Sequence, residues 1–205
     1  MILFNCEDEA MGRALEFSQD EALSKAMFIF WEKGYENTSL KELLETMGIQ
    51  NGSFYNTYRN KRQVFIQAMK FYERDFSLKR SALFQNPKTD FKKKMRILFK
   101  HTLDRQKESV CPKGCFLFNS VTAEVLGDVE LFKLVRKGVE NFEEFLVAEI
   151  AQSIQKKEIG ASVDPRLTAS LIVTYIQGLM KLSMLDYSDA KFREQTEYFL
   201  VSLGV

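Results

Sequence analysis

The sequence predicts an all-α protein in which three short helices precede a larger bundle of longer ones. Only 3 prolines and 10 glycines occur in 205 residues, so few positions interrupt a helix. Apolar residues recur at intervals of three and four along most of the chain, and no segment alternates with the period of a strand. Hydrophobic residues make up 45% of the chain, which is enough to build a core.

The bulk composition limits the class of protein. The net charge is +1, so any surface for nucleic acid must be local. Three cysteines form an odd and sparse set, which argues against a secreted disulfide scaffold. The first residues lack a basic segment before an apolar one, and no apolar run reaches membrane-spanning length. We therefore expect a soluble, cytoplasmic protein without a signal peptide or membrane contact.

Capping residues mark the first two helices. Ser18 and Glu21 have the spacing of a capping box, and Gly34 can end the helix that follows. A second such pair, Ser39 and Glu42, begins another helix. Gly48 can end it, and the next short helix is expected at about 50–57.

The later helices are longer. One begins at Asn60, whose side chain can cap it while Gln63 returns the bond, and it stays apolar to about residue 84. The remaining helices are expected at about 89–108, 115–126, 129–157, 165–187 and 189–203. The change of character near residue 62 predicts a tail at 1–17, a first module at 18–62 and a bundle at 63–205.

Two short helices joined by a glycine turn are typical of a helix-turn-helix, whose second helix enters the DNA major groove. Gln50 and Asn51 would begin that helix, and amide side chains can bond adenine in bidentate fashion. Other short or phosphate-bonding side chains on it are Ser53, Tyr55, Asn56 and Thr57. Alternatively, the segment is a small helical core in which Phe54 and Tyr58 are buried and the polar residues are merely solvated.

Positive charge gathers at the same place. Residues 46–62 hold three cations, Arg59, Lys61 and Arg62, and no acid. Residues 20–45 instead hold six acids and three lysines. Lys61 and Arg62 would begin the next helix, where free backbone N–H groups also favour phosphate.

Residues 22–69 resemble the DNA-binding module of TetR-type transcriptional regulators. The matching pieces are "FWEKGYENTSLKELLETMGI", "GSFYNTY" and the lysine at position 61. The resemblance implies that Tyr55 and Lys61 contact phosphates and that Thr38 and Ser39 touch the DNA backbone. The segment departs from the family pattern in two ways. Gln50 and Asn51 replace a Ser followed by a basic or polar residue, which would weaken the helix cap and alter operator preference, and Tyr58 replaces Phe.

The same resemblance implies that the larger bundle binds an inducer and forms a homodimer. We expect the helices at 129–157 and 165–187 to make a four-helix interface with a second copy. About half of their apolar residues would face that partner, from the set Leu134, Phe142, Phe145, Ile150, Leu171, Tyr175, Ile176, Leu179 and Leu182.

A Gly-Cys helix opening at residues 114–115 is similar to one branch of the family, which includes some thiol- and electrophile-responsive repressors. Cys115 would lie in the first turn of a helix, two residues after Lys113, and both features favour the thiolate. Cys111 could be a resolving thiol, and Phe118 completes the candidate ligand or thiol sensor. The alternative is that Cys115 is an ordinary buried residue.

The function expected from these patterns is a ligand-controlled transcriptional regulator, most simply a repressor that a small molecule releases from double-stranded operator DNA. A helical thiol redox enzyme using Cys111 and Cys115 is the competing hypothesis. We expect no enzyme activity, because no nucleotide or catalytic motif occurs. We also expect no cofactor and no metal, since Cys-x₃-Cys beside the single histidine, His101, is a poor zinc pattern.

Overall fold

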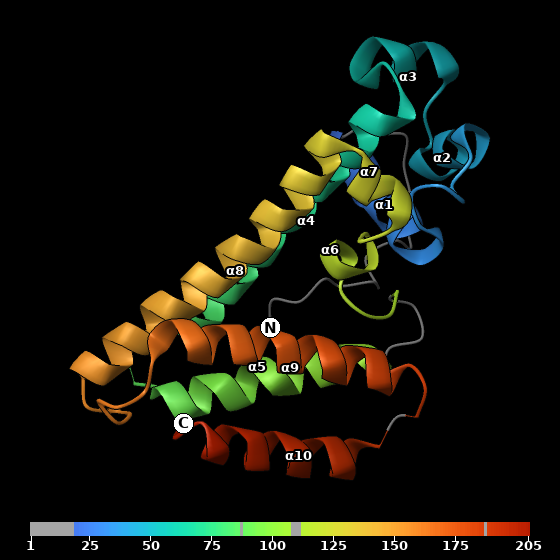
Figure 1. Ribbon diagram of the computed structural model, residues 1–205. Coiled ribbons are helices and arrows are strands. Elements are labelled where there is room, and N and C mark those ends of the chain that lie inside the picture. Colours follow the sequence, from blue (N-terminus) through green and yellow to red (C-terminus); the bar gives the residue numbers. More distant parts are fainter. Residues whose placement is uncertain (1–18, 87, 108–111, 187) are drawn as a thin grey trace. The chain divides into compact units, whose positions relative to one another are not determined.

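The computed structural model in Figure 1 describes residues 19–86, 88–107, 112–186 and 188–205. Every regular element in these ranges is an α-helix, which confirms the all-α prediction. None of the described helices is both long and apolar enough to cross a membrane. The expected tail at 1–17, the cap at Ser18 and Cys111 lie outside the described residues.

The chain forms two compact units. The first contains the described residues up to 79, Pro112 and residues 116–136. The second contains residues 80–107, 113–115 and 137–205, again as far as they are described. These two units do not correspond to the expected domains, whose boundary was placed at residue 62. That domain boundary stays a prediction.

The first unit begins with three helices whose ends follow the predicted signals: α1 (Gln19–Lys33), α2 (Leu40–Met47) and α3 (Asn51–Tyr58). Ser39 and Glu42 form the complete capping box of α2. Gly34 and Gly48 have φ angles of 81° and 68°, a left-handed conformation that glycine adopts without steric cost. Both glycines therefore end their helices as expected.

The rest of the first unit comprises the N-terminal part of α4 (Lys61–Phe84), α6 (Phe116–Asn119), α7 (Ala123–Gly127) and the start of α8 (Val129–Gln155). Asn60 caps α4, because its Oδ1 accepts the N–H of Gln63 at 2.9 Å.

An aromatic cluster forms the core of the first unit. The Phe116 ring lies 5.9 Å from Trp31, 5.9 Å from Phe65 and 5.5 Å from Tyr72, measured between centroids. All four side chains are buried. The short helix α6 thus serves to insert Phe116 between α1 and α4.

The prediction of a single helix at 115–126 is wrong, because the chain forms two separate helices there, α6 and α7. The Ser120 hydroxyl donates to the Phe116 carbonyl at 2.8 Å. Thr122 then takes an extended conformation, and its side chain accepts the Val125 N–H as the cap of α7. A hydroxyl that bonds nearby backbone competes with the helical bonding pattern, which explains the break.

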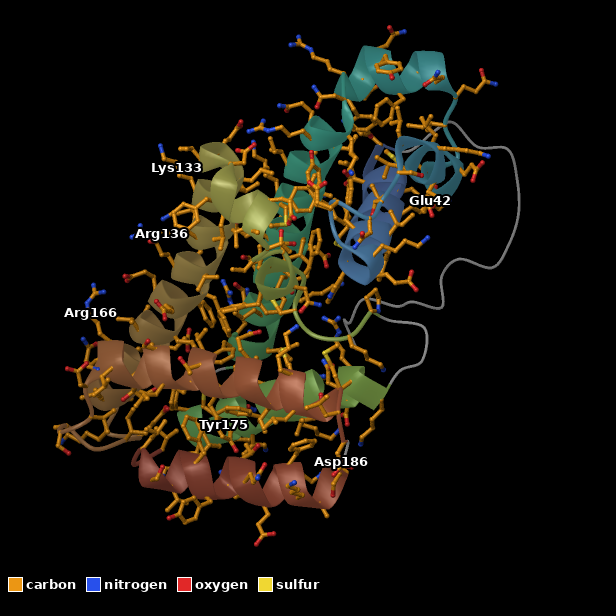
Figure 2. The ribbon with its side chains drawn as sticks, turned by 45° about the vertical axis from the view of Figure 1, so that its right-hand side comes forward. Glu42, Lys133, Arg136, Arg166, Tyr175 and Asp186 are labelled. Atoms are coloured by element: carbon orange, nitrogen blue, oxygen red, sulfur yellow. The ribbon has the colours of Figure 1, made fainter. Side chains whose placement is uncertain are left out.

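In the second unit, α5 (Phe91–Lys107) lies beside both α9 (Pro165–Ser183) and α10 (Asp189–Ser202) (Figure 1). Tyr175 of α9, labelled in Figure 2, stacks on Phe199 of α10 with 3.9 Å between ring centroids. The buried Phe99 of α5 meets both rings at their edges. α9 ends at Ser183, four residues before the expected end.

Glu42, labelled in Figure 2, predicts an acid-sensitive step in stability. Hydrogen bonds from Lys33, at 2.6 Å, and from Ser39 lower the pKa of the Glu42 carboxyl to about 2. Because the pKa of Glu42 is lower in the folded state than its unfolded value of 4.5, its ionised carboxylate stabilises the fold at pH values above 4.5. This stabilisation is lost as the pH falls from 4.5 through about 2. In urea unfolding, wild type should exceed Glu42→Gln in stability at pH 7, and the difference should shrink across that window. A difference that does not change with pH would contradict this origin.

Candidate nucleic-acid interface

Helix α3 buries only two of its eight residues. Phe54 and Tyr58 are fully buried, one turn apart, with their rings 5.8 Å between centroids. The other side of the helix faces solvent. Its exposed residues are Asn51, Gly52, Ser53, Tyr55, Asn56 and Thr57. The structure therefore brings five of the predicted DNA contacts onto one short, accessible helix.

The N-terminus of α3 has no side-chain cap. Gln50 occupies the cap position with an extended backbone (φ −78°, ψ 154°), but its side chain makes no capping hydrogen bond. This confirms the weak cap expected from the departure at this position. The exposed amides of Gln50 and Asn51 lie at the helix start, where base-contacting residues of a recognition helix lie.

Thr38 and Ser39 differ in accessibility. Thr38 is fully buried, and its hydroxyl donates to the Gly34 carbonyl at 2.8 Å. Its side chain thus holds the turn between α1 and α2 and does not reach the surface. Ser39 is exposed, with its hydroxyl bonded to Glu42 in the cap.

Lys61 begins α4 beside the end of α1. Its Nζ lies 4.5 Å from the Tyr35 ring centroid and 3.4 Å from the Glu36 carbonyl oxygen. These contacts orient the ammonium group without neutralising it, because neither partner carries a negative charge. The side chain stays partly exposed and suited to a phosphate.

Arg62 is bound internally, which corrects its expected role at the phosphate backbone. Its guanidinium makes a bidentate pair with Asp128, at 2.7 and 2.8 Å, and reaches Glu130 at 2.8 Å. Arg62 holds the pKa of the Asp128 carboxyl well below its usual range, with help from the Leu131 N–H. Asp128 lies 66 residues away in the chain, so spacing gave no signal of this pair.

Tyr58 carries a buried hydroxyl that has no hydrogen-bond partner among the described residues. Burial also raises the pKa of Tyr58. Leaving a buried polar group unsatisfied costs about 1–3 kcal/mol. The family's phenylalanine at this position would avoid that cost, so the exchange is less conservative than its shape suggests.

The candidate thiol sensor is only partly described. Cys115 is buried and immediately precedes α6, which has four residues, while Phe118 is half-buried. The preceding Gly114 N–H donates to the buried Gln106 side chain at 3.1 Å. A reactive role for Cys115, with Cys111 and Phe118, stays a prediction. No cluster of metal-ligating residues occurs in the described ranges.

The second unit contains a cavity of about 320 Å³ between α5 and α10. Its apolar lining comes from Phe99 and Leu103, and its rim carries ion pairs. These join Arg96 to Glu197, Arg193 to Asp189 and Lys100 to Asp104.

Comparisons with known proteins agree with this architecture. Residues 22–68 match the family described as bacterial regulatory proteins, tetR family. Residues 92–199, more than half of the chain, match the tetracyclin repressor-like C-terminal domain. The chain belongs to the TetR family.

Relatives of this TetR-family protein span nearly its whole length. It is 27% identical to the uncharacterized HTH-type transcriptional regulator YezE of Bacillus subtilis, over 95% of this chain and 99% of that protein. It is 26% identical to the HTH-type transcriptional repressor ComR of Escherichia coli, over 85% and 83% of the two chains. The fold is similar to that of a cysteine mutant of the TetR-family regulator CifR in complex with 26-base-pair operator DNA. The TM-score is 0.79 at 22% identity, over 94% of this chain and all of that one.

The protein is therefore a DNA-binding transcriptional regulator. The comparisons lend no support to the redox-enzyme hypothesis.

The adjacent cations Lys61 and Arg62 should behave differently on DNA. Lys61→Ala should weaken binding to all sequences about equally and reduce the salt slope of binding by about 1, because one phosphate contact is lost. Arg62→Ala removes the same charge but should leave the salt slope unchanged, since its guanidinium is paired with Asp128 and Glu130. Titrations at several salt concentrations measure both slopes. Equal changes for the two variants would contradict this assignment.

Proposed function

We propose that this TetR-family protein is a homodimeric repressor that a small molecule releases from its operator. The observation that carries the proposal is α3, an accessible helix held by two buried aromatics with its polar residues facing solvent. Gln50 and Asn51 would read base edges, while Ser39, Tyr55, Thr57 and Lys61 would contact the backbone. Ser53 and Asn56 could reach either.

A second copy of the chain would cover the outer face of α9 and α10. Large apolar side chains are exposed there, including Tyr198 at 79%, Val201 at 68% and Leu182 at 53%. Large apolar side chains exposed on one pair of helices are typical of an interface. The self-complementary contact of a two-fold dimer would bury it.

The proposed dimer helices thus differ from those expected from the sequence, which were α8 and α9. Val129 and Phe132 at the start of α8 are exposed, but within residues 137–155 no large hydrophobic side chain is exposed, and Phe142 and Ile150 are buried. Leu171 and Leu182 of α9 are exposed as expected, whereas Ile176 and Leu179 are buried. We therefore replace α8 with α10 in the proposed interface.

Release by a small molecule would follow from the dimer geometry. Two recognition helices reach successive major grooves when they are about 34–36 Å apart. A ligand in the C-terminal bundle that prefers another spacing would lower operator affinity. A tenfold loss requires a preference of about 1.4 kcal/mol between the two states.

Selection of bound duplexes from a random DNA pool tests the proposal most directly. A repressor should enrich a two-fold symmetric site with half-sites about one helical turn apart. In cells, a reporter placed behind that site should be repressed. Failure to enrich any sequence, or activation of the reporter, would reject the proposal.

Base reading by Gln50 and Asn51 has its own test. Alanine at either position should cost about 1–3 kcal/mol on the selected site and relax the preference at neighbouring base pairs. Binding to random duplexes should change little, because those complexes depend on phosphate contacts. Equal losses on selected and random DNA would instead make these residues backbone contacts.

The dimer face is tested by introducing charge. Leu182→Glu and Tyr198→Glu should shift the protein from dimer to monomer in light scattering, because each buries a carboxylate in an apolar contact. The matched control is Leu78→Glu on α4, a residue 65% exposed outside this face, which should leave the dimer intact. Monomers from the control alone would place the interface elsewhere.

A further inference from the structure

The turn between α3 and α4 (Figure 1) has an unusual backbone conformation at Arg59. Its backbone angles are φ 68° and ψ −46°, and the Asn60 N–H donates to the Tyr58 carbonyl at 2.8 Å. This is a γ-turn of the positive-φ form, which is rare and strained. Glycine would adopt it with the least strain, yet the chain places a long cationic side chain there.

The turn is held at both ends. Tyr58 before it is fully buried, and Asn60 after it caps α4. The Arg59 N–H also donates to the Tyr55 carbonyl at 3.2 Å. Packing and hydrogen bonds therefore hold the backbone from which the Arg59 side chain projects in a single conformation. Strained residues maintained in this way cluster at functional sites.

Arg59 also differs in its contacts from Lys61 and Arg62, the other two cations of residues 46–62. Arg62 is paired with Asp128 and Glu130, and Lys61 lies against Tyr35 and Glu36. Arg59 is exposed, and within the described part of the chain no carboxylate, carbonyl or ring contacts its guanidinium. It directly follows the recognition helix, one turn beyond Tyr55.

We propose that Arg59 is a DNA-contacting residue that binds a backbone phosphate beside the groove read by α3. A guanidinium presents paired N–H donors that match two phosphate oxygens. The strained turn aims this group, which explains why arginine is present where glycine would relax the backbone. The proposal rests on the placement of α3 in the major groove.

The experiment compares the urea midpoint with DNA affinity for Arg59→Gly and Arg59→Gln. Arg59→Gly should leave the urea midpoint unchanged or raise it, because the strain is relieved. It should also weaken binding at 0.1 M salt by up to about tenfold and reduce the salt slope by about 1. Arg59→Gln keeps a side chain on the strained backbone but removes the charge, so it should reduce the salt slope by the same amount. Arg59→Lys keeps the charge and should retain the wild-type salt slope. The loss should be equal for the selected duplex and a scrambled duplex of the same length.

A charge-matched control is Lys92→Gln, an exposed cation of α5, which should change neither midpoint nor slope. An unchanged salt slope in Arg59→Gly would overturn the proposal, as would a loss confined to the selected duplex. If wild type binds no duplex, the operator-binding proposal fails first. If wild type binds DNA and the salt slope falls in Lys61→Ala but not in Arg59→Gly, only the assignment of Arg59 fails.

Discussion

An eight-residue helix is unstable in water by itself, so α3 depends on the packing of Phe54 and Tyr58. This constraint shapes the whole first unit. The helix lacks a side-chain cap at its N-terminus, and its C-terminus ends in a strained turn. Both features leave its stability to two aromatic side chains and their neighbours. In return, every other position of the helix is available for contact with DNA.

The tertiary structure gives the cations around α3 different contacts. Arg62 joins the start of α4 to Asp128, which also accepts the N–H groups of Glu130 and Leu131 at the start of α8. This pair thus links the start of α4 to the start of α8 within the first unit. Lys61 and Arg59 remain on the accessible side. A local basic surface arises although the whole chain is nearly neutral.

In the second unit, exposed ion pairs surround the aromatic contacts between α5, α9 and α10. Pairs such as Arg96–Glu197 are nearly half exposed, and exposed pairs contribute little to stability. The contact of Phe99 with Tyr175 and Phe199 is the stronger link between these helices. The outward faces of α9 and α10 are left apolar, which is the basis of the proposed dimer.

Local signals in the sequence were sufficient for helices α1 to α4 and for the position of the candidate interface. The capping box at Ser39, the glycine ends at Gly34 and Gly48, and the cap at Asn60 all act within four residues, so they can be read without the fold. The exposed residues of α3 followed from the same short-range pattern. The break between α6 and α7 was missed, because a hydroxyl at Ser120 or Thr122 is compatible with either a helix or its end.

Only the tertiary structure decided which of these residues are accessible and which are already engaged. It buried Thr38, paired Arg62 with Asp128 across 66 residues, left the Tyr58 hydroxyl without a hydrogen-bond partner among the described residues and exposed Tyr198 and Val201 on α10. The sequence by itself determined most of the helices, the turn glycines and the polar face of α3, because those depend on neighbours along the chain. Burial and ion pairing depend on neighbours in space, and the chain must fold before these exist.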